Sequence, residues 1–255
     1  MKNKFLNFLL HTLLPISFWL LVWEVAALIY DNSYFLPDIG ETLLALCKII
    51  VSPDFPKIVI STLLRIIAGI LLGTLSGALM AILSHKIKLV HSLISPFNSV
   101  IKATPVASII ILLWISMNGN ALAIFVAFLI VFPIIFQNLY DAFESIDNQL
   151  IEASIIFEFS YKKRLKLLVL PALKQYFVPA FITAIGLAFK AEIAAEIIAG
   201  IRNSIGQMIY YAKDEPAIDE MFAWTIVGVT LSILVEKLVK RMLSYKKASK
   251  RRAEI

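Results

Sequence analysis

Charged side chains at five positions interrupt the apolar runs over residues 58–84, 96–117 and 176–199, and these groups could interact with an ionic solute or with each other. Glu192 and Glu196 are four residues apart and therefore share one face of a helix. Lys190 points about 200° away from Glu192 at about 100° per residue, so it cannot readily neutralise either carboxylate within its own helix. A charge partner on another helix is therefore expected. The five residues are Arg65, Lys102, Lys190, Glu192 and Glu196.

Two interpretations of these charged groups are open. In the first, they form ion pairs between helices, and Glu24 is one candidate partner for Lys190; in the second, they line the path of a solute. Arg65 and Lys102 lie toward the ends of their apolar runs, where a long side chain can extend to a polar surface at low cost. The candidate pathway residues are Lys102, Lys190, Glu192 and Glu196.

Groups that catalyse reactions are not assembled in a recognisable pattern. The sequence contains no GxxxxGK[ST] phosphate-binding loop, so the chain is expected neither to bind nor to hydrolyse ATP. His11, His85 and His91 lack the spacing of metal ligands, which predicts no metal site. The single cysteine, Cys47, cannot form an intramolecular disulfide. We therefore expect a protein that is not an enzyme and that binds no cofactor itself.

The composition indicates which elements must position these charges. The 255 residues are 60% hydrophobic and 16% charged, whereas soluble domains are roughly 25% charged. A bilayer core of about 30 Å requires about 20 helical residues, and the apolar runs reach this length. The expected fold class is an all-α polytopic membrane protein whose first helix is retained rather than removed as a signal peptide. The six expected transmembrane helices are residues 5–30, 58–84, 96–117, 121–140, 176–199 and 218–235.

Lysine and arginine residues are concentrated in segments that would lie on one side of a membrane. If the N-terminus is inside, most of them fall in the first residues, in 84–95, in 141–175 and in the tail. This distribution satisfies the positive-inside rule with both termini cytoplasmic. The tail, residues 244–255, contains KKASKRR and is more typical of contact with anionic lipid than with nucleic acid.

The inner loop between the fourth and fifth expected helices contains the stretch EASIIFEFSYKKRLKLLVLP, residues 152–171. Ile151, Ile155 and Phe159 recur at helical spacing, which predicts a short amphipathic helix with Ser154 outside the apolar stripe. An amphipathic element that does not cross the bilayer must lie on lipid or in the groove of a partner.

The second half of this loop predicts another short helix over residues 161–168. Ser160 is a suitable N-cap for it. Pro171 is expected to break or kink the helix near Leu170, because the residue before a proline is biased away from the helical region.

The whole stretch resembles the EAA motif of ABC-importer permeases, which reads Glu-Ala-Ala, three residues, Gly, nine residues, Ile-x-Leu-Pro. Here Glu158 occupies the position of the family's glycine, and glutamate does not adopt a left-handed turn as readily as glycine does. Other segments, STLLR from Ser61, IKATPVASIIILLW from Ile101 and AEIIA from Ala195, are similar to permeases of the nitrate/sulfonate/taurine type. The matching motif residues are Glu152, Ala153, Ser154, Ile155, Ile156, Phe157, Glu158, Leu170 and Pro171.

This resemblance implies a MetI-like fold of the type I ABC-importer kind, with a cytoplasmic coupling helix. It implies a homodimer in a bacterial inner membrane, two ATP-binding subunits that hold ATP and Mg, and an extracytoplasmic binding protein. The implied solute is small, polar and anionic, such as nitrate, a sulfonate, taurine or a vitamin precursor. Glu152 would orient the loop, Ile155, Ile156 and Phe157 would pack into the ATPase, and Pro171 would fix the exit into the fifth helix. A secondary transporter or channel without an ATPase is the alternative.

Three glycines, Gly69, Gly73 and Gly77, share one face of the second expected helix. Small residues at this spacing let two helices approach closely, either within one subunit or at a dimer seam. The expected organisation is an N-terminal helix and outer connector (1–57), a permease core (58–243) with a coupling loop at about 141–175, and a basic tail (244–255).

Overall fold

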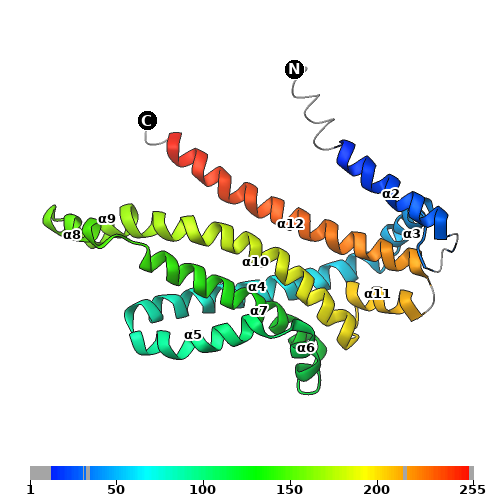
Figure 1. The fold of residues 1–255 in the computed structure, drawn as a ribbon, viewed down its shortest axis with the longest axis horizontal. Coiled ribbons are helices and arrows are strands. Elements are labelled where there is room, and N and C mark those ends of the chain that lie inside the picture. The colour runs from blue at the N-terminus through cyan, green and yellow to red at the C-terminus, as the bar shows by residue number, and fades with distance from the viewer. Residues whose placement is uncertain (1–12, 31, 33–34, 215–216, 253–255) are drawn as a thin grey trace.

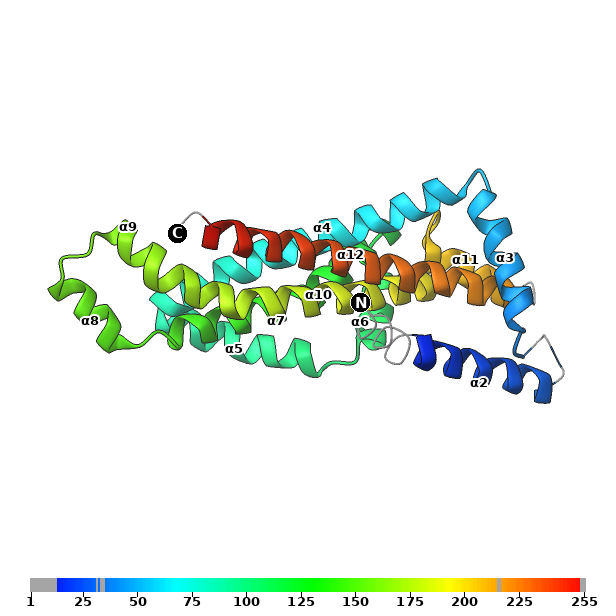
Figure 2. The ribbon, with the colours of Figure 1, turned by 90° about the horizontal axis from the view of Figure 1, so that it is seen from above.

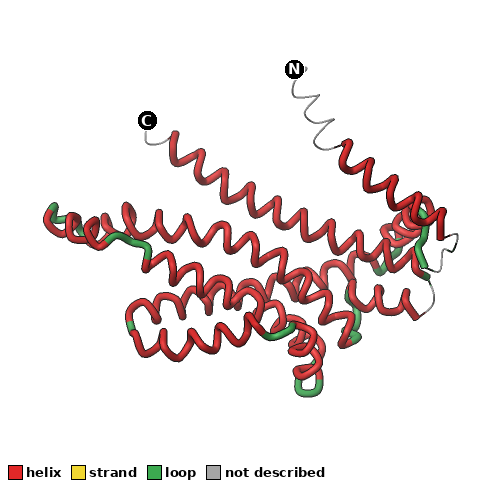
Figure 3. Tube along the Cα trace, in the orientation of Figure 1, coloured by secondary structure: helices red, strands yellow, loops and turns green. Residues whose placement is uncertain are grey.

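The computed structural model describes residues 13–30, 32, 35–214 and 217–252, and every regular element in these ranges is helical (Figure 3). The expected all-α class is therefore confirmed, whereas the N-terminal part of the first expected helix lies outside the described residues. In chain order the elements are α2 (Leu14–Tyr30), α3 (Ile39–Val51), α4 (Phe55–Lys86), α5 (Lys88–Ala103), α6 (Val106–Trp114), α7 (Gly119–Glu144), α8 (Asn148–Ile156), α9 (Tyr161–Arg164), a π-helical turn η2 (Leu165–Val169), α10 (Leu170–Ala199), α11 (Ile205–Asp214) and α12 (Ile218–Arg252).

Three of the described helices, α4, α7 and the Ile218–Leu243 part of α12, are long and apolar enough to cross a membrane. A fourth crossing results if α5 and α6 are counted together. α10 is 30 residues long, yet it carries Lys174, Lys190, Glu192 and Glu196 among its apolar residues. α2 has 17 described residues, slightly short of a full crossing.

The expected single helix over 96–117 is wrong, because α5 and α6 meet at a bend of 99°. Thr104 between them is extended, with φ −78° and ψ 130°. Pro105 follows it, and a proline disfavours the helical conformation of the preceding residue and removes a backbone donor. The local sequence therefore ends α5 at Ala103 and starts α6 in a new direction.

The main core lies where α4, α7 and α10 pack against one another. α4 presents its three glycines to α7: a Cβ on Gly73 would lie 2.7 Å from Cβ of Val131, and a Cβ on Gly77 would lie 2.9 Å from the carbonyl oxygen of Phe132. α10 presents a stripe of small residues to the same core, which again permits close helix packing. The fully buried members of this stripe include Ala184 and Ala188.

The helices run roughly along one long axis, so the two ends of the molecule differ in content (Figures 1 and 2). α8 and α9 lie at one end, beyond the bundle, and the C-terminal end of α12 points toward that end. α3 and α11 lie at the opposite end.

Candidate functional site

The loop with the EAA-like motif contains a helix, α8, whose tip exposes apolar side chains. Asp147 caps the helix by accepting a hydrogen bond of 2.8 Å from the backbone N–H of Gln149. Ile156 is 78% exposed and Phe157 is 74% exposed, at the end of the molecule that projects beyond the bundle (Figure 1). Ser154 is buried instead of lying outside the packed face, and its Oγ donates to the carbonyl of Ile151 over 2.6 Å.

The residue at the glycine position of the motif, Glu158, adopts the left-handed conformation with φ 53°. The N–H of Glu158 bonds to the carbonyl of Ile155, and the N–H of Phe159 bonds to the carbonyl of Ser154 over 2.8 Å. These two bonds form a Schellman motif, which satisfies carbonyl groups left free at a helix C-terminus. The turn that glycine would favour therefore forms with glutamate, at the steric cost of a Cβ in the left-handed region.

The chain then enters α10 through a continuous helical path rather than through a break. Ser160 accepts a hydrogen bond from the N–H of Lys163 and caps α9 as expected. Of the expected break or kink near Leu170, the break does not occur: η2 widens the helix, and the N–H of Leu170 bonds to the carbonyl of Leu165. A proline ring clashes with the carbonyl four residues before it, and a π turn just ahead of Pro171 provides space for that ring.

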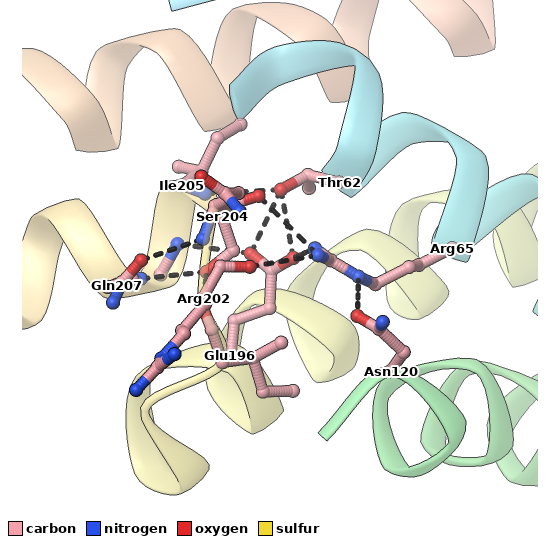
Figure 4. Close-up of polar contacts among 11 residues, drawn as sticks. Thr62, Arg65, Asn120, Glu196, Arg202, Ser204, Ile205 and Gln207 are labelled. Atoms are coloured by element: carbon pink, nitrogen blue, oxygen red, sulfur yellow. Dashed lines mark hydrogen bonds and ion pairs between the residues drawn. The ribbon is translucent and has the colours of Figure 1, made fainter. Parts of the chain in front are cut away.

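A second polar site joins four helices around the carboxylate of Glu196 (Figure 4). Arg65 on α4 donates from Nη1 to Glu196 over 2.7 Å, and Thr62 one turn earlier donates its hydroxyl over 2.8 Å. The backbone N–H of Gly206, in the first turn of α11, donates over 3.0 Å. Glu196 is fully buried and thus accepts from two side chains and one helix N-terminus.

The guanidinium of Arg65 is buried as well, so it does not extend to a polar surface as expected from its position. Its Nε donates to Oδ1 of Asn120 over 2.9 Å, and its Nη2 donates to the carbonyl of Arg202 over 3.1 Å. Removing one partner from such a buried pair costs about 3–5 kcal/mol, because a charge is left uncompensated. The pair therefore fixes α4, α7, α10 and α11 relative to one another.

The remaining charged residues of the apolar runs differ in burial and in hydrogen-bond partners. Glu192 is fully buried, and neither carboxylate oxygen has a hydrogen-bond partner among the described residues. Lys190 and Lys102 are exposed, Lys190 on the side of α10 next to α12 and Lys102 in the last turn of α5 beside the bend. Glu24 accepts from the backbone N–H of Ile39 over 3.1 Å, at the start of α3.

Sequence reasoning did not identify the neutral partners of this network. Thr62 and Asn120 are polar residues near expected helix ends, where such residues are common, so their types carried no signal. The available signal was Arg65 itself, because a buried guanidinium needs several acceptors. Among the described residues, no group of three or more His, Cys, Asp or Glu side chains could hold a metal ion.

Comparison with known proteins identifies the class to which this fold and loop belong. The profile of the family "Binding-protein-dependent transport system inner membrane component" matches residues 69–246. A Methanocaldococcus jannaschii protein described as an ABC transporter permease protein is 22% identical over 226 residues, covering 85% of this chain and 83% of that protein. The crystal structure of an amino acid ABC transporter with histidines is similar in fold, with a TM-score of 0.58 and 14% identity over 77% of this chain and 93% of that chain.

The chain therefore belongs to the family of binding-protein-dependent transport system inner membrane components. It is an ABC-importer permease subunit, a multi-pass transport component of the membrane without catalytic activity of its own. Membership of this family implies an ATPase and a substrate-binding protein as partners.

Proposed function

We propose that two copies of this chain, each with six transmembrane helices, form the translocation pathway of an ATP-driven importer in a bacterial cytoplasmic membrane. Both termini are cytoplasmic, residues 58–243 form the permease core, and residues 244–255 lie on the membrane surface. The solute is small, polar and anionic, of the nitrate, sulfonate, taurine or vitamin-precursor kind. ATP and Mg are bound by the separate ATPase.

The observation that carries this proposal is the exposed apolar tip of α8. Ile155, Ile156 and Phe157 are exposed together at the end of the molecule, where they project beyond the helix bundle. An exposed apolar cluster on a short helix is typical of a surface that fits into the groove of a partner. We infer that this cluster enters a groove of the ATPase, with Glu152 and Ala153 on the flank of the same helix.

The route from this contact to the pathway is the continuous helical path through η2 into α10. Leu170 and Pro171 start α10, and Lys190 and Glu196 lie further along the same helix. A rigid helix can transmit a displacement of α8 to the residues that it carries. Movement of the ATPase would therefore reach the charged residues of α10 through the turn at residues 157–160 and then through one continuous helix from Tyr161 onward.

Substitution of the exposed tip tests the coupling role. Ile156→Asp and Phe157→Asp place a charge in the proposed contact, so the ATPase is expected to dissociate during purification and solute-stimulated ATP hydrolysis to be lost. Val51→Asp is the matched control, because Val51 is 83% exposed at the C-terminus of α3, at the opposite end of the molecule. An intact, active complex in both α8 variants would contradict the proposal, and solute movement by the chain alone would indicate a secondary transporter.

A further inference from the structure

A cavity of about 480 Å³ lies between α10 and α12, on the side of α10 that faces away from the main core. Its walls are mostly apolar and include Leu187, Ile193 and Val229. A few polar side chains converge on it, as is typical of sites for small ligands. These polar residues are Thr183, Lys190, Ser232, Glu236 and Lys240.

The contacts of two glycines show which residue of α12 lies opposite Lys190. A Cβ on Gly186 would lie 2.5 Å from Oε1 of Glu236, and a Cβ on Gly228 would lie 3.0 Å from the side chain of Ile193. Because α10 and α12 pack side by side between these contacts, Lys190 and Ser232 lie at similar heights. At 1.5 Å per residue, Lys190 is about 30 Å along α10 from Leu170 and about 14 Å from Ala199.

The charges in the cavity do not cancel. Nζ of Lys240 lies 3.4 Å from Oε2 of Glu236, one helical turn away on α12, so these two residues form an ion pair. Lys190 has no ion-pair or hydrogen-bond partner among the described residues. The cavity therefore carries one unpaired positive charge.

An unpaired ammonium that faces hydrocarbon within a transmembrane helix is unfavourable. We propose that the cavity between α10 and α12 binds a small solute with a single anionic group, which Lys190 binds directly and which the hydroxyl of Ser232 contacts. The proposal rests on the proposed function, because it assigns a solute class to the same permease. The hydroxyl of Thr183 and the ion pair of Glu236 with Lys240 border the rest of the solute.

A cysteine in the cavity reports occupancy directly. Cys47→Ser removes the native thiol, and Ser232→Cys places a nearly isosteric thiol beside Lys190; Val229→Cys on the same wall serves as a second reporter. The purified complex with its ATPase, in nanodiscs without nucleotide, is treated with a maleimide while methanesulfonate or nitrate is titrated. Ionic strength is kept constant with sodium gluconate, and tetramethylammonium is the cationic comparison. We expect both small anions to slow labelling and tetramethylammonium to have no effect.

Variants that remove a charge from the cavity should change the anion concentration that halves labelling, in opposite directions for lysine and glutamate. Lys190→Gln removes a charged hydrogen-bond donor, so the anion concentration that halves labelling should rise by about tenfold. Glu236→Gln removes the negative charge that pairs with Lys240, so this concentration should fall. Lys88→Gln, an exposed lysine at the start of α5 that does not line the cavity, should leave it unchanged.

Three results would overturn the inference. The first is equal protection by anions with and without Lys190. The second is labelling that depends on acidic lipid in the nanodisc rather than on the small anion, since a lipid headgroup would then be the occupant. The third is a reporter that is shielded without any anion and becomes reactive when the complex dissociates, since a second protein copy would then cover the cavity. If ATPase association remains sensitive to Ile156→Asp in the same preparations, the proposed function stands and only the assignment of the cavity fails.

Discussion

At the scale of single residues, Glu158 shows that the turn after α8 forms despite an unfavourable side chain. Its φ of 53° lies in the left-handed region, which costs a non-glycine residue about 1–2 kcal/mol. The two hydrogen bonds of the Schellman motif hold it there, together with the entry into α9. The backbone conformation of Glu158 is therefore set by the hydrogen bonds to the last carbonyls of α8 and not by the intrinsic φ preference of glutamate.

Glu158→Gly should stabilise the loop, because glycine adopts positive φ without this penalty. We expect the free energy of unfolding to rise by about 1 kcal/mol, which thermal denaturation of the purified chain in detergent measures. Glu152→Gly is the matched control within the helical part of α8, where glycine should lower stability by about 1 kcal/mol. Equal changes in the free energy of unfolding for the two substitutions would show that the left-handed conformation of Glu158 does not destabilise the protein.

At the scale of helices, the glycine face of α4 positions the polar network as well as the core. Gly73 and Gly77 bring α4 against the backbone of α7. The same close approach allows Arg65 on α4 to reach Asn120 in the first turn of α7. Packing within one subunit, one of the two expected uses of the ladder, is therefore a direct feature of this structure.

Gly73→Val should separate α4 from α7, because a Cβ there would lie 2.7 Å from Cβ of Val131. Overpacking of this kind costs typically about 1–3 kcal/mol, so the yield of monodisperse chain in fluorescence-detected size-exclusion chromatography should fall. Leu75→Val, on the exposed side of α4, should leave the yield unchanged. A folded chain that only loses its dimer would instead place the ladder at a subunit seam.

At the scale of the whole molecule, the two ends of the bundle carry different surfaces. α8 and α9, with Lys162, Lys163 and Arg164, lie at one end, and α11 lies at the other (Figures 1 and 2). The expected topology assigns the basic end to the cytoplasm, where lysine and arginine are favoured.

Single cysteines at the two ends test this topology. In a Cys47→Ser background, Tyr161→Cys should react with a membrane-impermeant maleimide only in inverted vesicles. Tyr211→Cys on α11 should react only in right-side-out vesicles, because the two positions lie on opposite sides of the proposed bilayer. Both parent side chains are exposed, at 75% and 49%. Labelling of both positions from the same side would contradict the six-helix arrangement.

Most helices, including the short helix of the EAA-like loop, could be predicted from sequence because their signals are local. Long apolar runs specify α4, α7 and α12, and the cap at Ser160 starts α9 where its hydroxyl can accept a backbone hydrogen bond. The bend at Thr104 was also encoded locally by Pro105, although the continuous hydropathy of 96–117 obscured it. The π turn before Pro171 was not predicted, because a proline near a helix start can be accommodated as well as cause a break.

The sequence by itself thus determined an all-helical membrane permease with an EAA-like motif in one loop, since hydropathy and motif spacing act over short distances along the chain. Only the tertiary structure decided which charges are paired. Arg65 and Glu196 are 131 residues apart in sequence and meet at 2.7 Å because α4 and α10 pack around α7. Lys190, six residues before Glu196, faces a cavity instead. Helix rotation and packing set the partner of each charge, and neither is encoded in the hydropathy of a single helix.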